Sequence, residues 1–398
     1  MRRLLLATIL PALAFAAPPP TQSRTSVLLI PMDQGAEASA VKLEAYMVEA
    51  LEAFPAAKVK KSDELFGLPG DEEAEASLRR AEKGYAESRR AFEAKEYEDA
   101  ERKLRATLKE YQRAAGALKA CDHYCDAIAM YAAVMQKRGD TEEAKLALLD
   151  LIALSPTYEI DVKRMGRELV SLRSQVATSR SAQFRGSAII RTRPSGARVY
   201  LDGEFKGYSP VTIHTLPVGK HLLAVERPGF YRHGQVIEVT PDDVEVAAEL
   251  EPTKQWKAWD GQMDKVAADA AKGQGASLSQ VGRMLALDRA LIGTLKEVSD
   301  QGTEVSLGVF DLRTGKQLAS RRAVYQGDEY GQLKNEVGRL VTALLNSVDR
   351  PKEVPRSSDP LDHTSGMEEW SGEDRGGRNQ KVDSSGDPLD SISGMEDW

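Results

Sequence analysis

The chain has few of the residues on which metal and redox chemistry depend. Its 398 residues include two cysteines and five histidines. Cys121, His123 and Cys125 stand close together, but a structural zinc site needs four ligands and the sequence offers no second cluster. It also contains no glycine-rich phosphate loop, no Gly-x-Ser-x-Gly elbow and no His-Glu pair at zinc-protease spacing. We therefore expect no enzyme activity, no cofactor and no metal site.

Long apolar runs are scarce as well. Met1-Arg2-Arg3 is followed by an apolar run of about 14 residues, which is too short to cross a bilayer comfortably. Ala14-Phe15-Ala16 then offers a small-x-small cleavage pattern, so residues 1–16 are interpreted as a secretory signal peptide, with an uncleaved anchor as the alternative. Since no later run is long enough to span a membrane, we expect an exported protein of the periplasm or cell surface, without a transmembrane segment after cleavage.

The charge is concentrated at one end. The formal net charge is -7, and the residues from Asp349 onward contain 13 acidic and 6 basic side chains, so the rest of the chain is close to neutral. A near-neutral body without a basic stripe argues against nucleic acid as a partner. The 41% hydrophobic and 29% charged residues suit a globular protein of two or three domains.

Residues 71–180 are rich in Ala, Glu, Lys, Arg and Leu, with apolar positions at helical spacing, which predicts a helical domain. Two stretches, AFEAKEYEDAERKLRATLKEY and VMQKRGDTEEAKLALLDLIALSP, each run helix, short polar turn, helix. They resemble tetratricopeptide repeats, in which Ala100 and Ala144 match the small residue between paired helices, Tyr97 the turn aromatic and Pro156 the terminating proline. The resemblance implies a groove for a peptide or partner helix, and a helical spacer is the alternative.

Residues 186–252 alternate apolar and polar positions, as in Ala197, Val199 and Leu201, and turn residues such as Asp202-Gly203 interrupt them at short intervals. This pattern predicts a small antiparallel β-sandwich. The stretches RPSGARVYLDGEFKGYSPVTI and LPVGKHLLAVERPGF resemble a PEGA domain, although Ser195 stands where the acronym has Glu. That resemblance implies an architectural module of bacterial envelope or surface proteins.

Two distant segments each look like half of one domain. Residues 25–68 offer a strand, a helix and a second short strand, whereas residues 276–348 read helix, strand, strand, strand, helix. The second segment resembles TolB amino-terminal and CsgG-type envelope domains through Asp288, Gly293, Asp311, Thr314 and Gly315. Neither half can bury its own face, so we expect one discontinuous α/β domain into which the other modules are inserted, giving a multidomain α+β fold.

Residues 253–275, which follow Pro252, are interpreted as a linker. Trp256 and Trp259 stand three positions apart within it. On a helix they would either anchor the linker against a neighbouring domain or face a ligand, and packing is favoured because Trp mostly contributes buried apolar area.

Cys121 and Cys125 leave three interpretations open. In an oxidising compartment they can form a local disulfide ahead of the helix that begins near Asp126. One continuous helix through both would disfavour that bridge, and free buried thiols and a metal site are the alternatives.

Residues 349–398 are predicted to be a disordered acidic tail, because apolar residues are too few for a core. It holds two copies of one motif, DPLDHTSGMEEW and DPLDSISGMEDW, identical at nine of twelve positions. Large apolar anchors among carboxylates suit a linear motif that docks in a basic and apolar groove, and two copies can add avidity. A solvated tail without a partner is the alternative. The predicted partner-binding residues are Leu361, Met367, Trp370, Leu389, Met395 and Trp398.

Together these features predict a non-enzymatic adaptor or scaffold of the bacterial cell envelope, which binds envelope proteins through its helices and tail motifs. The alternative is a glycan- or peptidoglycan-binding module, in which aromatic rings of the β-domain stack on cell-wall sugars. The predicted glycan-contacting residues are Tyr200, Phe205, Tyr208, Phe230 and Tyr231.

Overall fold

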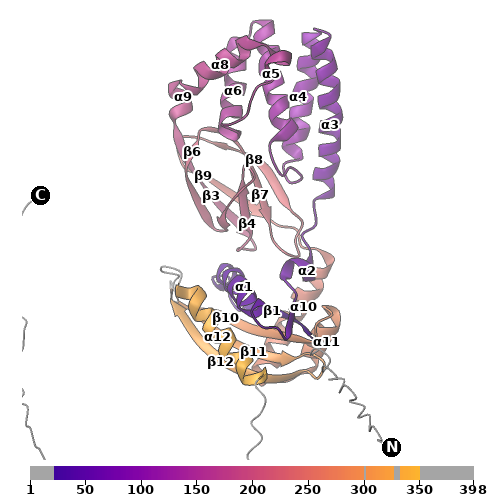
Figure 1. The fold of residues 1–398 in the computed structure, drawn as a ribbon, viewed down its shortest axis with the longest axis vertical. Helices are drawn as coiled ribbons and strands as arrows, with labels where there is room; N and C mark the ends of the chain where they lie inside the picture. The colour runs from indigo at the N-terminus through magenta and orange to yellow at the C-terminus, as the bar shows by residue number, and fades with distance from the viewer. Residues whose placement is uncertain (1–21, 300–301, 327–331, 350–398) are drawn as a thin grey trace, which may run out of the picture. The chain divides into compact units, whose positions relative to one another are not determined.

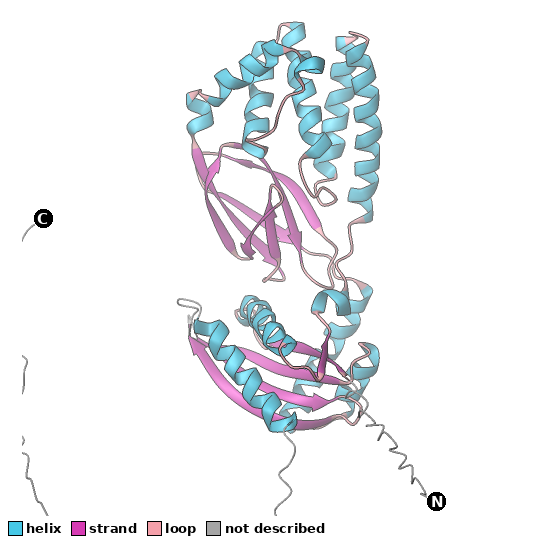
Figure 2. Cartoon of the chain, in the orientation of Figure 1, coloured by secondary structure: helices cyan, strands magenta, loops and turns pink. Residues whose placement is uncertain are grey.

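The computed structural model describes residues 22–299, 302–326 and 332–349, which fold as a multidomain α+β protein (Figure 1, Figure 2). The predicted signal peptide at 1–16 lies outside the described residues. So does the tail from residue 350 onward, with its six predicted partner-binding residues.

One α/β domain is built from the two ends of the described chain, as the sequence predicts. Its first part comprises β1 (Ser23–Pro31), α1 (Ala36–Glu52), β2 (Ala57–Val59) and α2 (Ser62–Phe66). Its second part comprises α10 (Lys254–Lys272), α11 (Ala276–Met284), β10 (Arg289–Ser299), β11 (Gly302–Asp311), β12 (Lys316–Gln326) and α12 (Gln332–Asp349). The strands form one sheet in the order β12-β11-β10-β1-β2, in which indigo β1 lies beside the orange strands of Figure 1.

The pairing of β1 with β10 joins the two halves. The two strands are parallel, with Thr25 opposite Arg289 and Pro31 opposite Leu295. Helices α1 and α12 pack on one face of the sheet, and α10 and α11 pack on the other. Because both faces are covered, β1 is buried without interruption from Thr25 to Ile30, and the second part of this stretch, Val27 to Ile30, is entirely apolar.

The segment 253–275, interpreted above as a linker, is instead largely the helix α10. The side chain of Thr253 accepts a hydrogen bond from the backbone N–H of Trp256 (3.1 Å), and Gly273 ends the helix in a left-handed conformation. Its apolar face packs against the sheet through Trp259, Val266 and Ala267. Pro252 precedes the helix and does not interrupt it, so the proline does not mark a flexible linker.

The helical domain consists of two long helical hairpins followed by short helices, around one apolar core. Its elements are α3 (Glu72–Glu93), α4 (Tyr97–Arg113), α5 (Asp122–Arg138), α6 (Thr141–Leu154), α7 (Val162–Met165), α8 (Arg167–Ala177) and α9 (Arg180–Gln183). Ala100 and Ala144 are fully buried, as small residues between paired helices must be. The tetratricopeptide assignment itself stays a prediction.

The β-domain consists of two packed sheets. Its strands are β3 (Arg185–Arg193), β4 (Arg198–Leu201), β5 (Glu204–Tyr208), β6 (Val211–Pro217), β7 (Gly219–Glu226), β8 (His233–Val239) and β9 (Val244–Glu249). The sheet orders are β6-β3-β9 and β5-β4-β7-β8, with one apolar core between them.

The prediction of a purely antiparallel sandwich is wrong in one place, because β3 and β9 pair in parallel from Ala188–Val244 to Arg193–Glu249. The connections require this. Strand β3 enters from the helical domain and β9 leaves into α10 of the α/β domain, so both run from the helical side toward the sheet of the α/β domain.

Candidate functional site

A pocket of about 550 Å³ lies where the β-domain meets the α/β domain. Strand β1 and helices α1, α2 and α10 contribute one side of it, and loops and strand ends of the β-domain contribute the other. Its lining combines aromatic and aliphatic side chains with several charged ones, including Glu44, Asp63, Arg198 and Arg227. Pockets of this size and mixed character are the usual form of a binding site.

Arg227, after β7, is the most deeply buried charged residue of this pocket, at 8% exposure. Its guanidinium donates a hydrogen bond to the Ser195 carbonyl and stacks near the rings of Phe230 (5.4 Å) and Trp256 (5.7 Å). Burial lowers its pKa to about 10, although nearby carboxylates act in the opposite direction. The residue is thus a charged group kept in an apolar setting by one backbone carbonyl and two aromatic faces.

Glu44, on α1, lies on the opposite wall. Burial raises the pKa of its carboxyl group to about 7, against the smaller opposing effects of a hydrogen bond from the Ser62 hydroxyl and of the Arg227 charge. Its carboxyl group can therefore gain or lose a proton near neutral pH. Such a shifted acid in a pocket is a common mark of a functional site.

Several hydrogen bonds hold the β-domain against the α/β domain around this pocket, and two sets of them involve carboxylates. The Arg198 guanidinium donates two hydrogen bonds to the Asp63 carboxylate, at 2.9 and 2.8 Å. The backbone N–H of Ser195 donates to the Glu37 carboxylate on α1, at 2.9 Å. The turn that contains Ser195 is therefore bound by a carboxylate from another domain.

Gly196 completes the turn. Its φ is +81°, and a Cβ atom there would lie 2.7 Å from the side chain of Val41 on α1. A side chain is excluded by both the backbone conformation and the close approach of the helix.

The two tryptophans predicted to pack do so, and they also line the pocket. The ring of Trp256 lies 5.1 Å from that of Phe66 and 5.0 Å from that of Phe230, and Trp259 lies 6.1 Å from Phe66. Phe230 is only 4% exposed within this stack. The sequence predicts that Phe230 contacts glycan, but the structure places it in the domain junction, because its backbone bridges to Pro252 and its ring packs on Trp256.

The other predicted glycan-contacting residues divide into two places. Tyr200, Phe205 and Tyr208 form a row on the β4–β5 hairpin, with ring centroids 5.6 and 5.4 Å apart. Phe205 is 51% exposed. Tyr231 is partly buried, and its backbone N–H donates to the Glu251 carbonyl at 2.9 Å.

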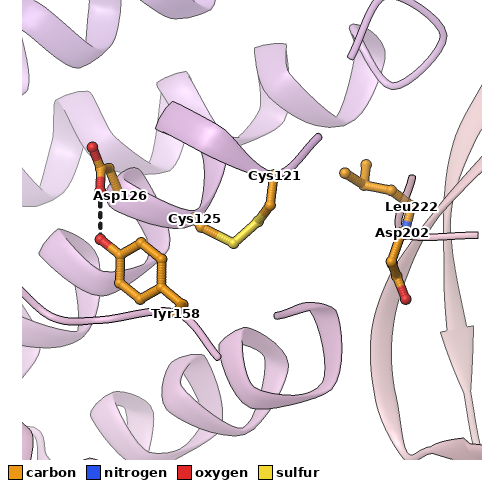
Figure 3. Close-up of a disulfide and its surroundings, with 6 residues drawn as sticks. All are labelled: Cys121, Cys125, Asp126, Tyr158, Asp202 and Leu222. Atoms are coloured by element: carbon orange, nitrogen blue, oxygen red, sulfur yellow. Dashed lines mark hydrogen bonds between the residues drawn. A yellow bond between two sulfur atoms is a disulfide. The ribbon is translucent and has the colours of Figure 1, made fainter. Parts of the chain in front are cut away.

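Cys121 and Cys125 are joined in a disulfide, with Cα atoms 5.3 Å apart (Figure 3). Cys121 precedes the first residue of α5 and Cys125 lies in its first turn, so the bridge closes the start of the helix. The following residue, Asp126, accepts a hydrogen bond from the Tyr158 hydroxyl. Leu222 of β7 belongs to the same apolar cluster, which continues from the helical domain into the β-domain.

Sequence reasoning missed Arg227 and Glu44. Both occur in stretches where a charge looks like an ordinary exposed residue, and they are separated by more than 180 positions. The only available signal was Pro228-Gly229, which predicts a loop but does not indicate that the preceding residue, Arg227, is buried. Among the described residues, no group of three or more His, Cys, Asp or Glu side chains could hold a metal ion.

Residues 185–254 match the PEGA domain family model, so the chain carries a PEGA domain. No curated protein matches the chain. The PEGA match covers the β-domain and leaves the helical and α/β domains unassigned. It is consistent with a module of extracellular or cell-envelope proteins.

Proposed function

We propose that this chain is a non-enzymatic adaptor of the bacterial cell envelope, exported to the periplasm or cell surface, that holds partner proteins on several surfaces. The PEGA match supports the location. In the described part of the chain, no helix is both long and apolar enough to cross a membrane. The helical hairpins and the split domain are proposed to be tetratricopeptide-like and TolB- or CsgG-like modules, respectively.

The observation that carries this proposal is that the PEGA domain is packed firmly against both of its neighbours, the helical domain and the α/β domain. Toward the helical domain, the Lys220 ammonium pairs with Asp150 at 2.6 Å, and a Cβ at Gly234 would lie 2.2 Å from the backbone of Gly116. Toward the α/β domain it is held by the contacts around the pocket. Residues 22–349 fall within a single compact unit. An adaptor needs such fixed spacing between its binding surfaces, because preorganisation lowers the cost of binding.

The partner-binding surfaces are proposed to be the helical groove and the two tail motifs. The experiment is an affinity capture from an envelope extract with the intact chain and with Trp370→Ala/Trp398→Ala. A matched control, Ser357→Ala/Ser384→Ala, changes the tail outside both motifs. Proteins that are lost only with the tryptophan variant support bivalent docking. Equal capture by all three chains contradicts it.

A glycan-binding role is the second candidate, and the aromatic row on the β4–β5 hairpin favours it. In this row Phe205 is exposed, whereas Tyr200 and Tyr208 are partly buried. Aromatic faces of this kind can stack on sugar rings. Co-sedimentation with purified peptidoglycan should fall at least several-fold for Phe205→Ala if the row binds glycan. Val324→Ala, at an equally exposed apolar position on β12 (55% exposed), serves as the control. Unchanged sedimentation of the Phe205 variant rules this role out.

A further inference from the structure

Strand β1 is paired along most of its length on one side only. On one side it pairs with β10 from Thr25 to Pro31, but on the other it pairs with β2 only from Ser23 to Thr25. The chain then leaves the sheet: the N–H of Lys60 donates to the Thr25 carbonyl at 2.8 Å, and α2 begins at Ser62. The remaining half of this side of β1 is therefore left without a neighbouring strand.

The backbone groups of Val27 and Leu29 point to this open side. Successive residues of a strand direct their N–H and C=O groups alternately to the two sides. The carbonyl of Arg24 and the N–H of Met32 bond toward β10, whereas the Thr25 carbonyl bonds toward β2. Val27 and Leu29 lie two and four positions after Thr25, so their N–H and C=O groups point to the same side of β1 as the Thr25 carbonyl.

These groups lack backbone partners among the described residues. Their only hydrogen bond there is a long one, 3.4 Å, from the Ser26 hydroxyl to the Val27 carbonyl. Yet Val27 is 0% and Leu29 8% exposed, so water compensates them poorly. Buried backbone groups are almost always paired, and an unpaired strand edge is a ready template for another strand.

The open side of β1 forms one wall of the interdomain pocket, which Val27, Leu29 and Pro31 line. A strand laid beside β1 would direct alternate side chains to the two faces of the sheet. On one face the pocket offers Val41, Ala45 and Val48 of α1; on the other it offers Phe66, Trp259 and Met263. From Val27 to Pro31 the edge is about 13 Å long, enough to pair with about five residues.

Arg227 adds a charge requirement. The guanidinium has five N–H donors, but its hydrogen bonds within the described chain reach only the Ser195 carbonyl, and no carboxylate there lies within ion-pair distance. Glu37 and Glu44 act on it only through space. A buried cation without a direct counter-ion favours a ligand that brings a carboxylate.

We propose that an extended acidic-apolar peptide segment of a partner protein binds as an added strand on the open side of β1, with apolar side chains at alternate positions and a carboxylate toward Arg227. The continuity of this edge with the existing β1–β2 pairing and the unpaired charge of Arg227 specify this occupant. The inference deepens the proposed adaptor function and rests on it, since it supplies a binding site for a protein partner.

The test begins with a phage-displayed library of random 12-residue peptides selected against the full chain. Enriched peptides are then synthesised, and amide hydrogen exchange is measured by NMR. At ten times the Kd, exchange of the Val27 and Leu29 amides should slow by about tenfold. Leu28 and Ile30, whose amides face β10, should change little. Failure to enrich any peptide, or enriched peptides that leave Val27 and Leu29 unaffected, would overturn the proposal.

Two variants check the location with the same peptides. Ala45→Trp fills the pocket from an exposed position of α1 and should weaken binding at least tenfold, while Ala106→Trp, exposed on α4, should change it less than twofold. Arg227→Met should weaken acidic peptides more than their amidated analogues. Equal Kd values for both tryptophan variants contradict the proposed location.

The strand site and the tail mechanism can fail separately. If selected peptides protect β1 while the Trp370→Ala/Trp398→Ala chain still captures every protein, the strand site stands and the tail mechanism fails. If the tail variant loses its partner and no peptide reaches β1, the adaptor stands without the strand site.

Discussion

Glu44→Gln should stabilise the protein at alkaline pH and much less in acid. The pKa of the Glu44 carboxyl is about 7 in the fold, against 4.5 ordinarily, and the largest cause is burial. Below both values the group is protonated in the folded and unfolded states, so it contributes no pH dependence. Between the two pKa values the carboxyl group ionises in the unfolded chain but stays largely protonated in the fold. The free energy of unfolding therefore falls as pH rises, and it levels off above about pH 7. Glutamine is neutral throughout and avoids this loss.

The difference between the two pKa values corresponds to about 3 kcal/mol. Because Glu44 borders an open pocket, solvent screens part of this cost, and we expect a gain of about 2 kcal/mol at pH 8. At pH 5 most of the carboxyl is protonated in the fold, so the gain should fall below about 1 kcal/mol. The Ser62 hydroxyl can still donate its hydrogen bond to the glutamine oxygen.

The assay is urea unfolding at pH 5 and pH 8 in a Trp370→Phe/Trp398→Phe background. Of the four tryptophans, Trp256 and Trp259 then remain, and both line the pocket that Glu44 borders. Glu49→Gln, an exposed carboxylate on the same helix, is the control and should change stability by less than about 0.5 kcal/mol at both pH values. An equal effect of Glu44→Gln at pH 5 and pH 8 would refute the assignment of a shifted carboxyl.

Three further changes test the domain junctions and the helical domain. Gly196→Ala should destabilise the chain by roughly 1–3 kcal/mol in urea unfolding, because a Cβ clashes with α1 at a positive φ; an unchanged midpoint would contradict the tight contact. A double-mutant cycle of Arg198→Ala with Asp63→Ala should give a coupling of about 1 kcal/mol, and zero coupling would show that this part-exposed pair does not hold the domains. Replacing Cys121 and Cys125 with Ser and Ala should cost roughly 2 kcal/mol or less, measured by thermal unfolding, because the closed loop is short.

Local pattern was enough to identify the modules. Alternating residues and turn signals between 186 and 252 predicted the β-domain, because in a half-buried strand every second side chain must be apolar. Helical spacing between 71 and 180 predicted the helical domain, because the apolar side chains on the buried face of a helix recur every three to four positions. The pairing of the two ends could also be anticipated, since neither half has enough strands to bury its faces.

The sequence was less informative wherever an element's role depends on its neighbours. Residues 253–275 looked like a linker because Pro252 stands before them, whereas the helix is stabilised by burial of Trp259 against a sheet formed from both chain ends. Phe230 looked like an exposed aromatic, but the stack with Trp256 encloses it.

By itself the sequence determined the order and type of the modules, since periodicity and turn residues act over a few positions. Only the tertiary structure decided the site. Glu44 and Arg227 acquire their shifted properties from the burial that domain packing imposes, and Val27 and Leu29 have an open side because β2 turns away after three residues. Burial and strand pairing depend on segments far apart in the chain, so a pattern within a few neighbouring residues cannot predict them.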